Sequence, residues 1–132
     1  NDTATTEIYT SLFVGSADVY KRQGNDNALC VSRKQSAVGV ISGCAAALPE
    51  LICALDAAVV SGNAAREALL WGYLQDFIGW LDKFPTPFGV EEACRLRKLP
   101  ARPETSWLGD APLAEYRSWF VDWLPGVLRD SK

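Results

Sequence analysis

A short run of small and branched apolar residues, 37–42 (AVGVIS), constrains the fold more than any other feature of this sequence. Valine and isoleucine favour extended backbone, and an apolar run without alternation is typical of a strand buried on both faces of a parallel sheet. Such a strand needs a neighbour on each side, yet the sequence offers one candidate at most, residues 7–14 (EIYTSLFV). We therefore expect residues 37–42 to belong to a sheet whose other strands lie outside this sequence.

Most of the remaining sequence has the period of amphipathic helices. Apolar residues recur every three or four positions, which places an apolar stripe along one side of each helix. Residues 28–35 are predicted to form a helical turn or two. The spacing then predicts four longer helices, at residues 48–61, 64–83, 88–98 and 110–129.

Residues that start and stop helices support these boundaries. Pro49 suits a first helical turn, Gly62 suits the left-handed position after a helix ends, and Asn63 can cap the next helix. The two prolines within residues 84–87 (FPTP) cannot continue a helix. Pro125 should kink or interrupt the last helix near its end.

Composition and charge exclude several classes of function. The 132 residues contain no histidine, which rules out a histidine-based catalytic triad and a histidine-ligated metal. The net charge is −3 and the basic residues are scattered, so we expect no nucleic-acid partner. No apolar run approaches the roughly 20 residues that span a bilayer, so we expect no membrane partner.

Four cysteines, at positions 30, 44, 53 and 94, have spacings that match no zinc site. Cys44, Cys53 and Cys94 stand among apolar residues, where a free thiol packs as a small apolar side chain. We therefore expect reduced, buried cysteines in a cytoplasmic protein that lacks a secretory leader and uses no cofactor or metal.

An ordered series of short motifs suggests a family. Residues 24–26 (GND) are followed by 37–43 (AVGVISG), 48–50 (LPE), 61–63 (SGN) and 84–87 (FPTP). In their order and spacing, these motifs resemble the C-terminal portion of the dihydrodipicolinate synthase / N-acetylneuraminate lyase family, the class I pyruvate-type aldolases. The resemblance covers most of the chain.

The resemblance implies a fold and an activity. Family members are (β/α)8 TIM barrels, so the expected fold is α/β, a C-terminal fragment of such a barrel that is predominantly helical in the retained part. A lysine of the family forms a Schiff base with pyruvate or another 2-oxo acid, and a tyrosine relays protons. Both lie upstream of the matched motifs. We therefore expect a homo-oligomeric lyase when complete, and a catalytically inactive piece here.

The resemblance carries substrate-binding positions, and no catalytic one, onto this sequence. Gly24, Asp26 and Asn27 match a turn that contacts the hydroxylated tail of sugar-acid substrates. Ile41 matches a residue that borders bound pyruvate, and Gly43 matches a neighbouring substrate-side position.

Three segments are expected along the chain. Residues 24–99 correspond to the last βα units of the barrel, and residues 100–132 to a C-terminal helical extension. Residues 1–23 are interpreted as wholly or partly foreign, because residues 18–23 (DVYKRQ) equal the translation of a transposon end used to prepare sequencing libraries. The alternative is a genuine surface segment.

Alternative interpretations stay open at several positions. Asp26 could bond its own backbone as an ordinary turn residue. Lys34 has polar neighbours and is expected to be solvated, since a Schiff-base amine needs a desolvating pocket. Ala46 and Glu91 replace the asparagine and lysine that many family members have, which leaves the subfamily open. The whole chain could instead be a stand-alone helical interaction module without catalysis.

Overall fold

The computed structural model describes residues 25–102 and 110–132. This part of the chain contains five α-helices, and two single-turn 3-10 helices, η2 (Asp26–Ala28) and η3 (Cys44–Ala46), stand before α2 and α3. The five are α2 (Leu29–Lys34), α3 (Pro49–Ser61), α4 (Ala64–Leu81), α5 (Phe88–Leu96) and α6 (Asp110–Asp130). Every helix predicted from the sequence is therefore confirmed, with ends that shift by a few residues.

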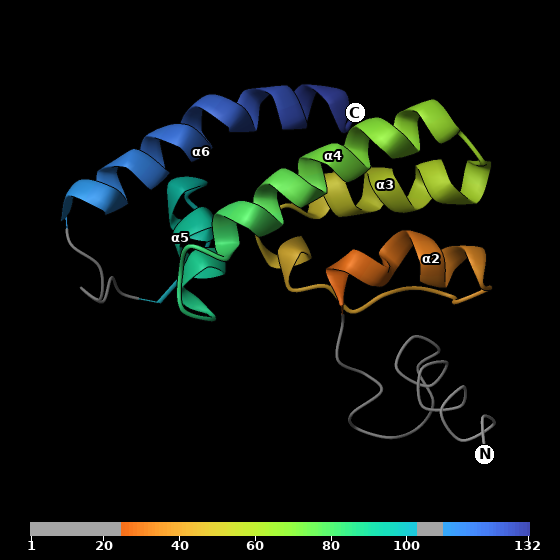
Figure 1. Cartoon of the computed structure of the whole chain (residues 1–132), viewed down its shortest axis with the longest axis horizontal. Coiled ribbons are helices and arrows are strands. Elements are labelled where there is room, and N and C mark those ends of the chain that lie inside the picture. The colour runs from red at the N-terminus through yellow and green to blue at the C-terminus, as the bar shows by residue number, and fades with distance from the viewer. Residues whose placement is uncertain (1–24, 103–109) are drawn as a thin grey trace, which may run out of the picture.

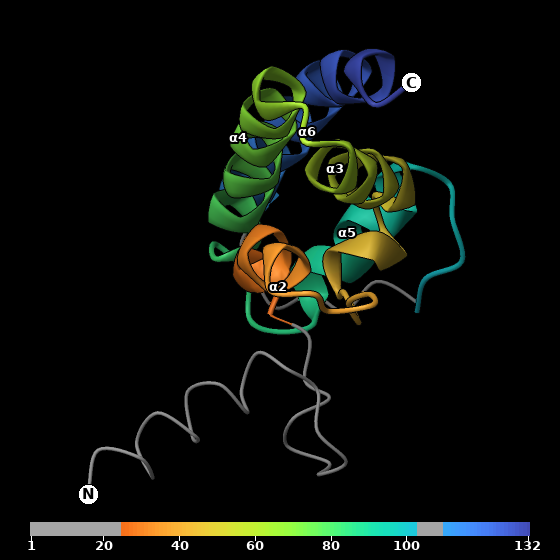
Figure 2. The ribbon, with the colours of Figure 1, turned by 90° about the vertical axis from the view of Figure 1, so that its right-hand side faces the viewer.

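The helices pack directly on one another. Helices α2, α3 and α4 lie side by side, and α6 runs over α4 (Figure 1). In the view turned by 90°, α3 and α4 lie side by side, α6 lies above them, and α2 and α5 lie below (Figure 2). No described helix is both long enough and apolar enough to cross a membrane.

The hairpin between α3 and α4 turns where the sequence predicts it. Gly62 has a left-handed backbone with φ of 70°, and its amide donates to carbonyls at the end of α3. The Asn63 side chain accepts a hydrogen bond of 3.1 Å from the backbone amide of Arg66. Glycine adopts this backbone without strain, while asparagine satisfies an amide that the first turn of α4 leaves open.

The core fills the space between α3, α4 and α6. Its completely buried side chains are leucines, phenylalanines and one valine: Leu51, Leu55, Leu70, Leu74, Phe77, Phe120 and Val127. These residues belong to the apolar stripes predicted for the three helices, with Leu51 and Leu55 on α3 and Phe120 on α6. Helix α6 continues through Pro125 to Asp130, so Pro125 does not interrupt the helix; a kink there stays a prediction.

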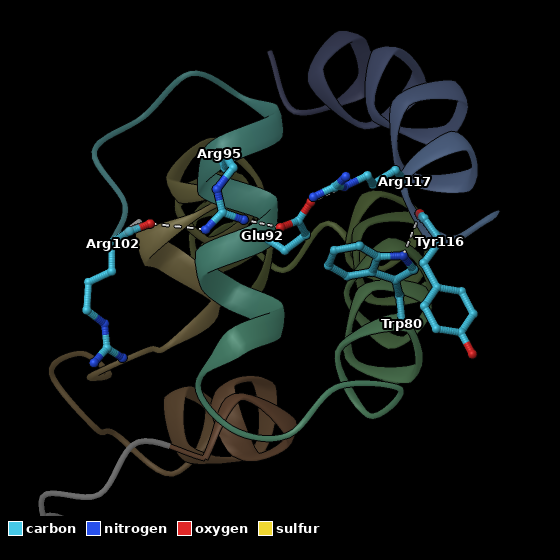
Figure 3. A network of polar contacts seen from close by, with 6 residues as sticks. All are labelled: Trp80, Glu92, Arg95, Arg102, Tyr116 and Arg117. Atoms are coloured by element: carbon cyan, nitrogen blue, oxygen red, sulfur yellow. Dashed lines mark hydrogen bonds and ion pairs between the residues drawn. The ribbon is translucent and has the colours of Figure 1, made fainter. Parts of the chain in front are cut away.

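Polar contacts also hold α6 in place (Figure 3). The indole nitrogen of Trp80 on α4 donates to the Tyr116 carbonyl on α6 over 2.9 Å. Glu92 on α5 is 4% exposed, and its carboxylate contacts Arg95 on the same helix and Arg117 on α6. Helix α6 is therefore joined to α4 by a hydrogen bond and to α5 by a buried charge.

The expected α/β fold, a fragment of a TIM barrel, is wrong. No β-strand occurs within 25–102 or 110–132, and residues 37–42 have no regular secondary structure. The backbone of residues 38–41 forms no hydrogen bond with any described residue, Val38 is fully exposed and Ile41 is 65% exposed. A strand exists only where a second strand completes its hydrogen bonds, and the other described segments are helices and their connections. Over these residues the chain is an all-helical body.

Two more expectations concern the N-terminal segment and the cysteines. Residues 1–24 lie outside the described part of the chain, and with them the strand expected at 7–14 and the segment interpreted as foreign. All four cysteines are free, and three are buried as predicted, but Cys53 is exposed. The prediction failed at Cys53 because this residue lies beside, and not within, the stripe of Leu51, Ile52 and Leu55 that α3 buries.

Candidate functional site

A pocket of about 550 Å³ lies where η2, η3 and the connection between α4 and α5 meet. One side is the turn formed by Asn25, Asp26 and Asn27. The opposite side includes Asp82 and Thr86, which follow the end of α4. Polar groups from two distant parts of the sequence thus face a common space.

Side-chain hydrogen bonds fix the turn at residues 25–27. The Asn25 side chain accepts from the backbone amide of Asn27 over 3.1 Å, which caps η2. The Asn27 side-chain oxygen accepts from the Gln75 amide over 2.9 Å, which ties the turn to α4. Asparagine is suited to this position because its short side chain can bond backbone nearby.

Asp26 is the charged residue of this turn, and its two carboxylate oxygens differ. Oδ2 accepts a hydrogen bond of 3.3 Å from the Cys44 backbone amide at the start of η3. Oδ1 is buried and has no hydrogen-bond partner among the described residues. A buried carboxylate oxygen without a full set of hydrogen bonds is destabilising, so a movement of the turn that let a ligand hydroxyl reach Oδ1 would gain a favourable contact.

The Cys44 thiol is beside this carboxylate and stays protonated. Burial raises its pKa most, and the nearby negative charge of Asp26 raises it further. A thiolate is the reactive form of cysteine, so Cys44 is not a nucleophile at neutral pH. The residues that line this pocket include no lysine or arginine. The charged groups of this pocket are therefore carboxylates, which accept hydrogen bonds from donors such as hydroxyl groups.

The structure brings together part of the predicted substrate-binding set. Asp26, Asn27 and Gly43 line the same pocket although Gly43 is far from the turn in sequence. Ile41 does not line it and points largely to solvent, and Gly24 is outside the described residues. Of the predicted positions that the structure describes, three line one pocket and Ile41 does not; their role in substrate binding stays a prediction.

Lys34 is a surface residue, as predicted. Its Nζ atom forms an ion pair with Glu67 over 2.6 Å, and its side chain is 58% exposed. The hydrogen bond that Lys34 donates to Glu67 raises the Lys34 pKa, which favours the charged ammonium. A charged, solvated amine does not form an imine readily, because the attacking species must be the neutral amine.

Sequence interpretation missed the pocket wall formed by the connection from α4 to α5. Gly89 in the first turn of α5 is buried, and a Cβ there would lie 2.9 Å from the Leu81 side chain and 3.3 Å from its backbone. Only glycine lets α5 begin this close to the end of α4. The glycine after FPTP was a signal for this approach, but its meaning depends on Leu81, which the sequence does not identify as a neighbour.

No family model, no curated protein and no solved structure matches this chain. The resemblance to the dihydrodipicolinate synthase / N-acetylneuraminate lyase family therefore stays a prediction. Within the described residues, no three cysteine or carboxylate side chains are grouped so that they could hold a metal ion.

Proposed function

We propose that this chain is the C-terminal part of a Schiff-base lyase acting on pyruvate or another 2-oxo acid, and that it binds the hydroxylated end of the substrate. The observation that carries the proposal is the common pocket of Asp26, Asn27 and Gly43. The lysine and tyrosine of the reaction would come from another part of the enzyme. The chain alone would therefore be inactive.

The negative charge of the pocket lining determines which end of a sugar acid it would bind. The polar lining includes the carboxylates of Asp26 and Asp82 and no basic side chain. These groups repel a substrate carboxylate and accept hydrogen bonds from hydroxyl groups. The hydroxylated tail would therefore enter this pocket, and the 2-oxo acid group would point away from it.

Free cysteines at all four positions support a reducing, cytoplasmic location for this enzyme.

Binding by the isolated chain tests the proposal. A ¹⁵N-labelled sample would be titrated with a 3-deoxy-2-oxo sugar acid, and the amide signals of Asp26, Asn27 and Gly43 should shift. Asp26→Asn should weaken binding by roughly tenfold or more, because hydrogen bonds to a charged acceptor contribute about 1.5–3 kcal/mol. Asp122→Asn, on an exposed position of α6, is the matched control and should bind as the wild type does.

A chemical assay tests the second half of the proposal. Pyruvate and borohydride would be added to the chain, and mass spectrometry would detect any reduced adduct. We expect none, because Lys34 is ion-paired at the surface and no lysine lines the pocket. A stoichiometric adduct on one lysine, or sugar-acid binding that Asp26→Asn leaves unchanged, would contradict the proposal.

A second candidate function, a helical interaction module, is favoured by residues 37–42. This segment has no regular secondary structure, and Val38 and Ile41 present apolar side chains to solvent. The helices beside it bury a continuous core of their own. The module hypothesis predicts a monodisperse protein that unfolds in one cooperative transition, whereas a piece of a larger enzyme is expected to aggregate. Light scattering and thermal unfolding by circular dichroism separate the two.

A further inference from the structure

A second pocket, of about 370 Å³, lies between α4 and α6 and shares no lining residue with the first. Its aromatic lining consists of Trp80 on α4 and of Tyr116 and Trp119 on α6. The hydrogen bond from the Trp80 indole to the Tyr116 carbonyl joins two of these residues (Figure 3). Trp119 stacks on Trp123, with 5.2 Å between the ring centres, and is 38% exposed. These contacts give the pocket fixed aromatic walls.

The charged groups of this pocket favour a cationic ligand. The carboxylates of Asp76 and Glu115 line it, and Lys83 is the one basic residue among its lining. The Lys83 ammonium lies 5.3 Å from the centre of the Tyr116 ring, within the range of a cation–π interaction. The chain therefore already places a cation against one aromatic wall of this pocket.

We propose that the pocket between α4 and α6 binds an organic cation of the quaternary or methylated ammonium class, and that Lys83 competes with this ligand for the Tyr116 ring. Aromatic faces attract such cations through the negative potential above the ring, and flanking carboxylates strengthen the attraction. An anionic ligand would be repelled by Asp76 and Glu115. The proposal does not depend on the lyase function, because the two pockets are separate.

Gly79 is the part of α4 at which the pocket lining has no side chain. It lies inside α4, its φ is not left-handed, and a Cβ would meet no atom within 4 Å. Glycine inside a helix is destabilising relative to alanine, so α4 is less stable with Gly79 than it would be with alanine at this position. It also leaves the pocket unobstructed, since Gly79 is part of the lining.

Choline and its neutral isostere 3,3-dimethyl-1-butanol are the probes for the test. The two molecules have the same shape and differ in the charge of the head group. A ¹⁵N-labelled chain would be titrated with each, and the indole N–H signal of Trp119, assigned from Trp119→Phe, would report occupancy. We expect a saturable shift with choline and none with the isostere. Equal saturable shifts with both probes would overturn the proposal.

Two variants of Lys83 and Glu115 test the charge argument. Lys83→Gln should tighten choline binding by about two- to fivefold, because it frees the Tyr116 ring and removes a repelling charge. Glu115→Gln should weaken binding by a similar factor. Weaker choline binding by Lys83→Gln would refute the competition between Lys83 and the ligand for the Tyr116 ring.

Two glycine variants of α4 test the location. Gly79→Leu places a side chain in the pocket and should abolish the choline shift. Gly72→Leu is the matched control: this glycine lies on the same helix, also has nothing within 4 Å of a Cβ, and does not line the pocket. Circular dichroism would show that both variants keep their helices. A choline shift that survives in Gly79→Leu would overturn the assignment.

Discussion

Glu92 is the buried charge that joins α5 to α6, and its replacement by glutamine tests how much this contact stabilises the fold. The Glu92 carboxylate contacts Arg95, and its Oε1 atom lies 2.5 Å from Nε of Arg117 (Figure 3). Glu92→Gln keeps the size of the side chain and removes its charge. Both guanidinium groups would then lose the carboxylate that they share.

The exposure of the two arginines sets the expected loss. Removing one partner of a fully buried ion pair destabilises a protein by about 3–5 kcal/mol, because the remaining charge stays buried. Here the side chains of Arg95 and Arg117 are 30% and 33% exposed, so water can reach both after the change. We therefore expect Glu92→Gln to lower the free energy of unfolding by about 1–3 kcal/mol.

The preceding residue is a matched control on the same helix. Glu91 pairs with Arg102, whose side chain is 67% exposed, and a pair of this kind contributes about 0–1 kcal/mol. Urea unfolding of the wild type, Glu91→Gln and Glu92→Gln would be followed by circular dichroism at neutral pH. We expect the larger loss at Glu92. Equal losses within about 0.5 kcal/mol would refute the argument from burial.

Three further predictions concern other parts of the fold. Gly62→Ala should lower the free energy of unfolding by about 1 kcal/mol, because the backbone at Gly62 is left-handed. Gly72→Ala, inside α4, should raise the free energy of unfolding by up to about 1 kcal/mol, because alanine favours the helix. Urea unfolding measures both, and a change in the same direction for the two variants would contradict the prediction. Cys53 is exposed and should be alkylated by iodoacetamide at neutral pH, whereas the buried Cys44 should be protected while the protein is folded. Mass spectrometry of the digested protein measures both, and alkylation of Cys44 as fast as that of Cys53 would contradict the prediction. The guanidinium of Arg97, the residue after α5, donates hydrogen bonds to Glu50 and lowers the Glu50 pKa below its ordinary value of 4.5. This contribution to stability is present above pH 4.5 and is lost as the pH falls through the lower folded pKa, so the pH dependence of thermal unfolding should flatten in Glu50→Gln. The same pH dependence in Glu50→Gln and the wild type would contradict this.

The sequence predicted the helices well because their signals are local. Gly62 and Asn63 satisfy the end of one helix and the start of the next through contacts a few residues away. The apolar stripes likewise need only the helical period. The strand at residues 37–42 failed because a strand depends on hydrogen bonds to a segment elsewhere in the chain, and the described residues supply none.

The candidate site was predictable on one side only. Asp26 and Asn27 form a turn whose motif is visible in the sequence, and the resemblance assigned them to substrate binding. The opposite wall, with Asp82 and Thr86, joins them through the packing of α5 on the end of α4. This packing depends on Gly89 approaching Leu81, a contact that spacing along the chain does not reveal.

Residues 37–42 show whether the two candidate functions exclude each other, because the segment is held at both ends and exposes Val38 and Ile41 between them. The Ala37 amide donates to the Ser32 carbonyl, and the Ser42 hydroxyl accepts from the Ala45 amide. Covering Val38 and Ile41 would remove two large apolar side chains from water, a gain of about 1.5–3 kcal/mol for each when burial is complete. Neither residue lines the Asp26 pocket, so a partner could bind the segment without blocking a ligand. The proposed binding of a sugar acid and the proposed binding of a partner are therefore compatible with each other.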